Sequence, residues 1–211
     1  FDIFVAKRPR ELPQYLFNSQ IISKSKPVQI ATFLSHLLSI KSALEKYDDD
    51  TFLILEDDAV LFPDPKLVGL DKVIANQDWE VLQLEHFTNK SIERFQNLYN
   101  KGVLLHRWRI TDYGAAAYLI RRKFAERLIN YFFGKGDNMK IDLKKCYEIE
   151  GDIVADNIIY DFAQTLVFTF PLCYQDVNLP SEMIHLYNPG ASLERVNQNK
   201  IVKNLWSKYF N

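Results

Sequence analysis

The feature that most constrains the fold is an apolar strand that runs directly into three consecutive acids. The segment FLILEDDAVLF, residues 52–62, places Glu56, Asp57 and Asp58 where a buried strand would end. Three adjacent carboxylates repel one another, and burial raises the cost of their charge. Either the chain leaves the core at this point and water solvates the acids, or a cation binds there.

Helix and strand patterns alternate on both sides of this strand. Apolar residues recur at helical spacing from Pro27 to Tyr47, and the run of aspartates at 48–50 ends that helix. Further helices are expected around 65–76, over 122–133, around 152–163 and in the polar tail 191–211. Strands are expected over 1–6, 51–55, 81–87 and 167–172, and residues 113–120 are expected to form a strand or a strand that enters a helix. This alternation predicts an α/β fold with a mixed, mainly parallel central sheet flanked by helices.

The predicted sheet favours a cation at the acidic triplet. Ligands of such sheets bind beyond the carboxyl ends of the strands, and TFLIL ends at Glu56. Clustered carboxylates suit hard divalent cations such as Mg²⁺ or Mn²⁺. Glu56 and Asp58 can face one ion while Asp57 points to a second partner. Such an ion can bridge the phosphates of a nucleotide diphosphate and neutralise the charge that builds on the leaving group.

Length and composition narrow the class of protein. The 211 residues suit one domain over 1–211, with 191–211 as a peripheral C-terminal segment. The net charge of −1 gives no general attraction to nucleic acid, and no apolar run is long enough to cross a bilayer. Cys146 and Cys173 form no metal-type spacing. The chain starts without Met, so we expect a fragment of a longer chain, and its compartment and oligomeric state stay undetermined.

Two segments resemble glycosyltransferase family 25, the family of lipooligosaccharide-biosynthesis and procollagen galactosyltransferases. Residues 33–62 carry a Leu-Ser-His-Leu helix at 34–37 followed by an aliphatic strand that ends in Glu-Asp-Asp at 56–58. Residues 113–129, YGAAAYLIRRKFAERLI, look like the family's Gly-x-x-Ala-Tyr-Leu-Ile stretch and the helix after it.

A third, weaker block spans 154–176, so the resemblance covers roughly residues 30–176. The sequence also departs from the family pattern. The glycine ahead of the Leu-Ser-His helix is absent, and Phe124 stands where many members have Gly. These departures bear on the donor base and the specific sugar more than on the fold.

The resemblance implies a GT-A type nucleotide-diphospho-sugar transferase with Mn²⁺ or Mg²⁺ as cofactor. It assigns Glu56 and Asp58 to the metal and diphosphate, and Asp57 to the donor sugar or ribose. It also draws Ser35 and His36 toward the donor, although a His on an amphipathic helix is as often a packed structural residue.

Two further roles come from what GT-A enzymes generally do. Inversion needs one general base for the acceptor hydroxyl; Asp156 matches that position, with Asp152 as a substitute, and its competing role is to cap a helix. His185 matches a C-terminal metal-binding His, although a surface histidine is an equally good interpretation. Gly114 would let a loop approach substrate closely.

The expected function is transfer of a sugar, galactose or glucose, from a UDP-sugar to a hydroxyl of a glycan or a hydroxylysine-type side chain. Basic residues that can offset the diphosphate are Arg107, Arg109, Arg121 and Arg122. The alternative is a transferase-like domain that has lost catalysis and serves as a binding module or scaffold. A metal-dependent phosphohydrolase or nuclease also uses clustered acids, but the net charge gives no support for a nucleic-acid surface.

Overall fold

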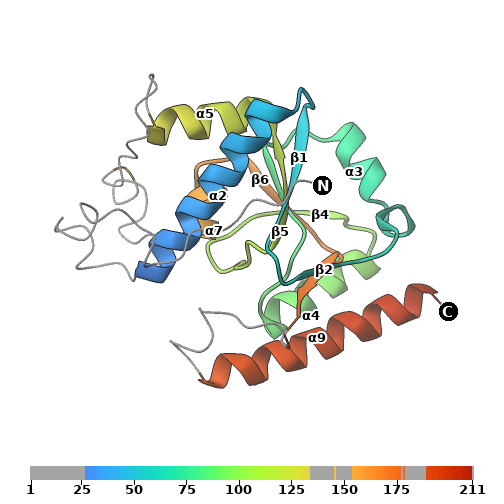
Figure 1. The fold of residues 1–211 in the computed structure, drawn as a ribbon. Coiled ribbons are helices and arrows are strands. Elements are labelled where there is room, and N and C mark those ends of the chain that lie inside the picture. The colour runs from blue at the N-terminus through green and yellow to red at the C-terminus, as the bar shows by residue number, and fades with distance from the viewer. Residues whose placement is uncertain (1–26, 134–144, 146–153, 177, 179–188, 211) are drawn as a thin grey trace. The chain divides into compact units, whose positions relative to one another are not determined.

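The computed structural model describes residues 27–133, 145, 154–176, 178 and 189–210 (Figure 1). Contacts divide the chain into two compact units. Unit 1 comprises Phe1–Ile54 and Ile120–Gln164, and unit 2 comprises Leu55–Leu119 and Thr165–Asn211. The strand predicted over 1–6, Asp152, Cys146 and His185 lie outside the described residues. One domain over 1–211 stays a prediction.

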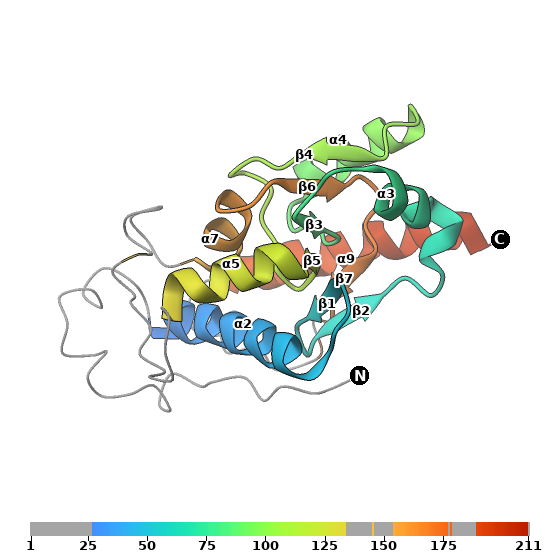
Figure 2. The same ribbon diagram turned by 90° about the horizontal axis from the view of Figure 1, so that it is seen from above.

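Unit 1 is built on three helices: α2 (Pro27–Lys46), α5 (Arg122–Phe133) and α7 (Ala155–Asp161). Helix α2 packs against α5 and α7, and Figures 1 and 2 both show α2 and α5 side by side. Ile30, Phe33 and Leu37 are fully buried, and Phe33 meets Phe132 edge to face with ring centroids 5.1 Å apart. The predicted helices over 27–47 and 122–133 are therefore confirmed.

The end of α2 is held by Arg122. Its backbone N–H donates to the Asp50 carbonyl over 2.9 Å, and its guanidinium donates to the carbonyls of Asp49, over 3.0 Å, and Tyr47. These bonds satisfy backbone carbonyls in residues 47–50, the segment that follows α2. The aspartate run 48–50 thus ends α2, as predicted, and β1 (Thr51–Leu55) starts directly after it.

The larger sheet is mixed, with the strand order β1-β5-β3-β6-β4. The new strands are β5 (Ala117–Arg121), β3 (Val81–Gln83), β6 (Thr165–Phe168) and β4 (Leu105–Arg107). Strand β6 pairs in parallel with β3, Val81 opposite Thr165, and antiparallel with β4, Leu105 opposite Phe168. The predicted α/β class is confirmed, whereas a mainly parallel sheet and a GT-A topology stay predictions.

Unit 2 adds a small antiparallel sheet and four helical segments. Strand β2 (Ala59–Leu61) pairs with β7 (Cys173–Gln175), Ala59 opposite Gln175. The helical segments are η2 (Pro65–Val68), α3 (Leu70–Asn76), α4 (Asn89–Asn100) and α9 (Pro189–Phe210). The two halves of the segment predicted as a helix around 65–76 are η2 and α3, while β2, β4, β7 and α4 were not predicted.

Helix α9 packs against β7 and α4 within unit 2. Val202 and Leu205 on α9 join a buried core that contains Phe62, Phe170 and Leu172. The Trp206 indole donates to the Pro171 carbonyl over 2.8 Å. The polar tail is therefore a helix, as expected, and it closes one side of this core. None of the helices in the described part of the chain is both long and apolar enough to cross a membrane.

Candidate functional site

The acidic triplet lies in a turn that backbone hydrogen bonds hold on both sides. Strand β1 ends at Leu55, and Glu56 N–H donates to the Ala116 carbonyl over 2.8 Å. On the other side, the Asp176 N–H donates to the Asp58 carbonyl over 2.7 Å. The turn is thus fixed between the Ala116 loop and the end of β7, all within unit 2.

Gln175, the last residue of β7, joins two of the three acids. Its amide nitrogen Nε2 donates to Glu56 Oε2 over 2.8 Å and lies 3.3 Å from Asp58 Oδ1. Asp58 is buried, Glu56 is half-buried and Asp57 is exposed. Because one nitrogen reaches both carboxylates, Glu56 and Asp58 converge on a single point.

A fourth carboxylate, Glu85, lies beside this pair. It follows β3, is 3% exposed, and its Oε2 accepts the Ala116 N–H over 2.9 Å. Gly114 has φ +126°, and a Cβ there would lie 2.8 Å from Glu85 Oε2. The loop before β5 therefore approaches the carboxylate closely because residue 114 has no side chain.

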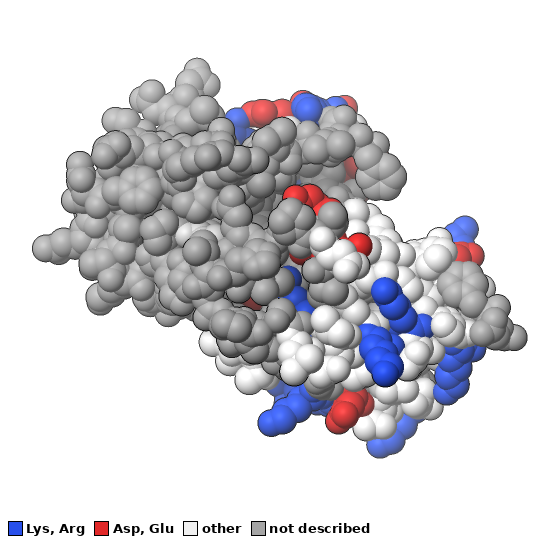
Figure 3. All heavy atoms as spheres, turned by 60° about the horizontal axis from the view of Figure 1, so that its bottom comes forward, with Lys and Arg blue, Asp and Glu red and all other residues white. Residues whose placement is uncertain are grey.

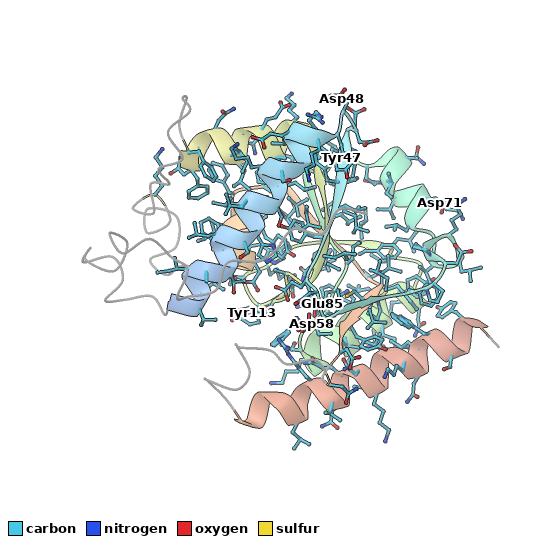
Figure 4. The ribbon with its side chains drawn as sticks, in the orientation of Figure 1. Tyr47, Asp48, Asp58, Asp71, Glu85 and Tyr113 are labelled. Carbon is cyan, nitrogen blue, oxygen red and sulfur yellow. The ribbon has the colours of Figure 1, made fainter. Side chains whose placement is uncertain are left out.

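Gln83 holds that loop in place from β3. Its side-chain Nε2 lies within hydrogen-bond distance of three carbonyl oxygens: Glu85 at 2.9 Å, Tyr113 at 3.0 Å and Gly114 at 3.3 Å. An amide nitrogen has two hydrogens, so these acceptors share them. Figure 4 shows Tyr113, Asp58 and Glu85 in the same region of the fold.

Burial and mutual repulsion dominate the electrostatics of the carboxylates. Burial, followed by the charge of Glu56, raises the pKa of Asp58 to about 6. The same two causes raise the pKa of Glu85 to about 8. The positive charge of Arg195 opposes both shifts. The group therefore forms a place where added positive charge is favourable.

Helix α9 supplies the polar side chains that face the acids. Asn199 Nδ2 donates to the Gln175 carbonyl over 2.7 Å, and the Gln198 amide donates to the Phe87 carbonyl. Arg195 Nη1 lies 4.0 Å from Asp58 Oδ2. A small pocket is lined by Glu85, His86, Gln175, Arg195, Gln198 and Asn199, among others. Polar side chains line the pocket both from the segment that follows β3 and from α9.

His86 is a buried neutral histidine at the same pocket. Its Nε2 lies 2.7 Å from the Phe168 carbonyl, which can only accept, so Nε2 carries the proton. Burial is the main cause that lowers the pKa of His86 to about 4. Nδ1 has no hydrogen-bond partner among the described residues. His86 therefore adds an acceptor, not a charge, to this region.

The residues present fit a divalent cation that also binds phosphate. Within the described ranges, no group of three or more His, Cys, Asp or Glu side chains is arranged to hold a metal ion. Mg²⁺, however, is usually held by one or two carboxylates together with phosphates and water. Glu56 and Asp58 offer such a pair, because oxygens of both lie within 3.3 Å of one nitrogen.

Of the residues proposed from sequence, Glu56, Asp58 and Gly114 come together in unit 2, Gly114 through its contact with Glu85. Asp57 is exposed beside them. Three others belong to unit 1: Ser35, His36 and Asp156. His185 lies outside the described residues.

The three unit 1 residues lie on two helices that pack together, α2 and α7. Ser35 Oγ donates to the Ala31 carbonyl over 2.8 Å, and His36 is buried. Asp156 is buried in the first turn of α7, and its Oδ1 accepts the Asn157 N–H over 3.1 Å. The N-cap of α7 is Val154, so Asp156 does not occupy the capping position. Its role as a base stays a prediction.

The site residues missed from sequence are Gln83, Glu85, Gln175, Arg195 and Asn199. Glu85 carries the same signal as the triplet, an acid at the end of an apolar strand, and could have been proposed from VLQLEHF. Arg195 lies in a polar tail with no motif around it. Of the arginines proposed to offset a diphosphate, Arg107 and Arg109 are exposed, and Arg122 binds backbone carbonyls at the end of α2.

In α/β sheets, ligands bind beyond the carboxyl ends of the strands, and Glu56 and Asp58 follow the carboxyl end of β1. The family model described as glycosyltransferase family 25 (LPS biosynthesis protein) matches residues 1–143. The chain belongs to this family. Among curated proteins, none matches the chain. Glu56, Asp58, Glu85 and Gly114 lie within the matched residues, whereas Gln175, Arg195 and Asn199 lie after them.

Proposed function

We propose that the protein is a metal-dependent, inverting glycosyltransferase of GT-A type. It transfers galactose or glucose from a UDP-sugar to a hydroxyl of a glycan or a hydroxylysine-type side chain. Family membership supports sugar transfer in general. The observation that carries the finer proposal is the convergence of Glu56 and Asp58, whose oxygens lie 2.8 and 3.3 Å from one nitrogen.

Each group has a defined task in this proposal. Glu56 and Asp58 would hold Mn²⁺ or Mg²⁺, and the ion would supply positive charge to stabilise the departing diphosphate. Asp57, exposed at the same turn, contacts the donor sugar or ribose. Ser35 and His36 contribute hydrogen bonds to the donor. His185 adds a further metal ligand.

The proposed reaction needs one general base to accept the proton of the acceptor hydroxyl. The acceptor oxygen attacks the anomeric carbon from the face opposite the diphosphate, and the bond from that carbon to the diphosphate breaks. The proton of the acceptor hydroxyl passes to Asp156. Asp156 suits this task as a buried carboxylate outside the capping position of α7.

The test is a screen of nucleotide sugars for hydrolysis or transfer with Mn²⁺ present. We expect activity with UDP-galactose or UDP-glucose and its loss on removal of the metal. Asp58→Asn keeps the size of the side chain but removes its charge, so activity should fall on the order of a hundredfold or more. Asp71→Asn, an exposed position on α3, is the matched control and should retain activity.

Two results would contradict the proposal. Full activity of Asp58→Asn would remove the metal role of that residue. Metal-dependent UDP binding without hydrolysis or transfer of any sugar would instead favour the binding-module alternative.

A further inference from the structure

Arg195 is a buried cation whose guanidinium, among the described residues, has one ionic contact and an Nε without a hydrogen-bond partner. The residue is 9% exposed. Its Nε has no hydrogen-bond partner among the described residues. Its ionic contact, Nη1 to Asp58 Oδ2, is 4.0 Å long, which exceeds hydrogen-bond distance. Burying a guanidinium in this way is costly unless something satisfies its donors.

The position of Arg195 is nevertheless fixed. Its guanidinium lies over the Phe87 ring, 5.2 Å from the centroid. Three and four residues further along α9, Gln198 binds the Phe87 carbonyl and Asn199 binds the Gln175 carbonyl. A planar cation is therefore held at the polar pocket next to Asp58 and Glu85.

The chemistry that fits such a group is a phosphate. Guanidinium N–H donors match phosphate oxygens in pairs. A carboxylate is already nearby and does not take these donors at short range. A metal-bound phosphate would place its cation beside Glu56 and Asp58 and its oxygens beside the Arg195 guanidinium. Both the acids and the arginine would then have partners of opposite charge.

The outer face of α9 has the charge that such a ligand requires. Lys200, Lys203 and Lys208 are exposed on this helix. Figure 3 shows Lys and Arg side chains spread over the described surface on the side that carries α9. Although the net charge of the chain is −1, this face attracts anions locally.

We infer that Arg195 binds the donor diphosphate and that α9 positions this arginine beside the acidic turn. The inference rests on the proposed function, because it assumes that a metal-bound diphosphate is the group that enters the site. Arg195 lies after residues 1–143, so the inference assigns phosphate binding to a residue outside the segment that matches the family model.

The test uses the full chain and two probes, UDP and inorganic pyrophosphate, each titrated calorimetrically in MgCl₂. Arg195→Gln should weaken both probes at least about tenfold, because charged hydrogen bonds are lost. Arg195→Lys keeps the charge but not the planar fork, and should show a smaller loss. Lys72→Gln removes the same charge from an exposed position on α3, and its affinities should stay within about twofold.

Thermal unfolding without ligand shows whether each variant is folded, so that a loss of binding is not mistaken for a loss of structure. If Arg195→Gln does not fold, Arg195→Lys is compared with wild type instead. If wild type and Arg195→Gln bind UDP and pyrophosphate equally, the inference is wrong while the proposed function stands. If wild type binds pyrophosphate through Arg195 but does not bind UDP, the inference holds and the UDP-sugar donor is wrong. If wild type binds neither probe, both are overturned.

Discussion

At the residue scale, Glu85 and Gly114 depend on each other. The carboxylate of Glu85 accepts the Ala116 N–H, and Gly114 lets the backbone pass close to the same oxygen. Gly114 makes room for a carboxylate of the protein itself, and its role in letting substrate approach closely stays a prediction. The glycine therefore shapes the site through Glu85.

Replacing Gly114 by Ala should destabilise the fold. The new Cβ would lie 2.8 Å from Glu85 Oε2, at a backbone φ of +126° that side chains rarely adopt. We expect a loss of about 2–3 kcal/mol in the free energy of unfolding, measured by urea denaturation. Gly102→Ala is the control, because its φ is +78° and nothing lies within 4 Å; it should cost roughly 1 kcal/mol. Equal losses for the two variants would show that the contact with Glu85 has no cost.

At the element scale, α9 does more than cover the core of unit 2. Its buried apolar residues pack into that core, and its polar residues reach the ends of β3 and β7. The same helix therefore stabilises the fold and carries side chains to the acidic turn. A change on its inner face should affect both.

Asn199→Ala tests how α9 is joined to β7. The substitution removes the donor that bonds the Gln175 carbonyl over 2.7 Å. We expect a loss of about 1–2 kcal/mol in unfolding free energy, because a buried carbonyl loses its partner. Asn204→Ala removes the same group from an exposed position on α9 and should change stability by less than about 0.5 kcal/mol. If Asn199→Ala is as stable as Asn204→Ala, the contact contributes nothing measurable.

The elements that sequence reasoning found are those with a strong local pattern. Helices α2 and α5 carry apolar residues at helical spacing, and β1 is a continuous apolar run. Strands β2 and β7 have three residues each, too few to show a period. Helix α4 was missed although it could have been found: Thr88 caps it, and Ile92 and Phe95 are spaced for one buried face.

The candidate site likewise contains residues that a local sequence pattern predicts and residues that it does not. Glu56 and Asp58 were predicted because an apolar strand and its acidic end are adjacent in sequence. Gln175 and Arg195 meet them only through strand pairing and helix packing between distant segments. No local pattern records such contacts, so the arginine that faces Asp58 could not be found from sequence, and arginines elsewhere in the chain were proposed in its place.

At the scale of the whole molecule, the residues that match the family do not make a complete unit 2. Residues 1–143 contain β3 but not its parallel partner β6. They also lack buried core residues from the later part of the chain: Phe168, Phe170, Leu172, Cys173, Val202 and Leu205. The last part of the chain is thus necessary for both the core and the acidic turn.

A fragment of residues 1–143 should not fold cooperatively. Losing β6, β7 and α9 exposes apolar surface that the remaining strands cannot cover, and stability is small compared with such losses. Circular dichroism during thermal denaturation should show no sigmoidal transition for the fragment and a clear one for residues 1–211. A cooperative transition in the fragment would mean that the later segments are dispensable for the fold.

Cys173, the first residue of β7, pairs with Leu61 of β2 and is a free thiol with no exposed surface. Burial, more than the nearby carboxylates, raises its pKa far above the usual range, so the reactive thiolate is absent from the folded protein. Alkylating reagents will reach it only when β7 opens. The rate of modification at Cys173, read by mass spectrometry separately from Cys146, therefore measures how often the strand that carries Gln175 leaves the core.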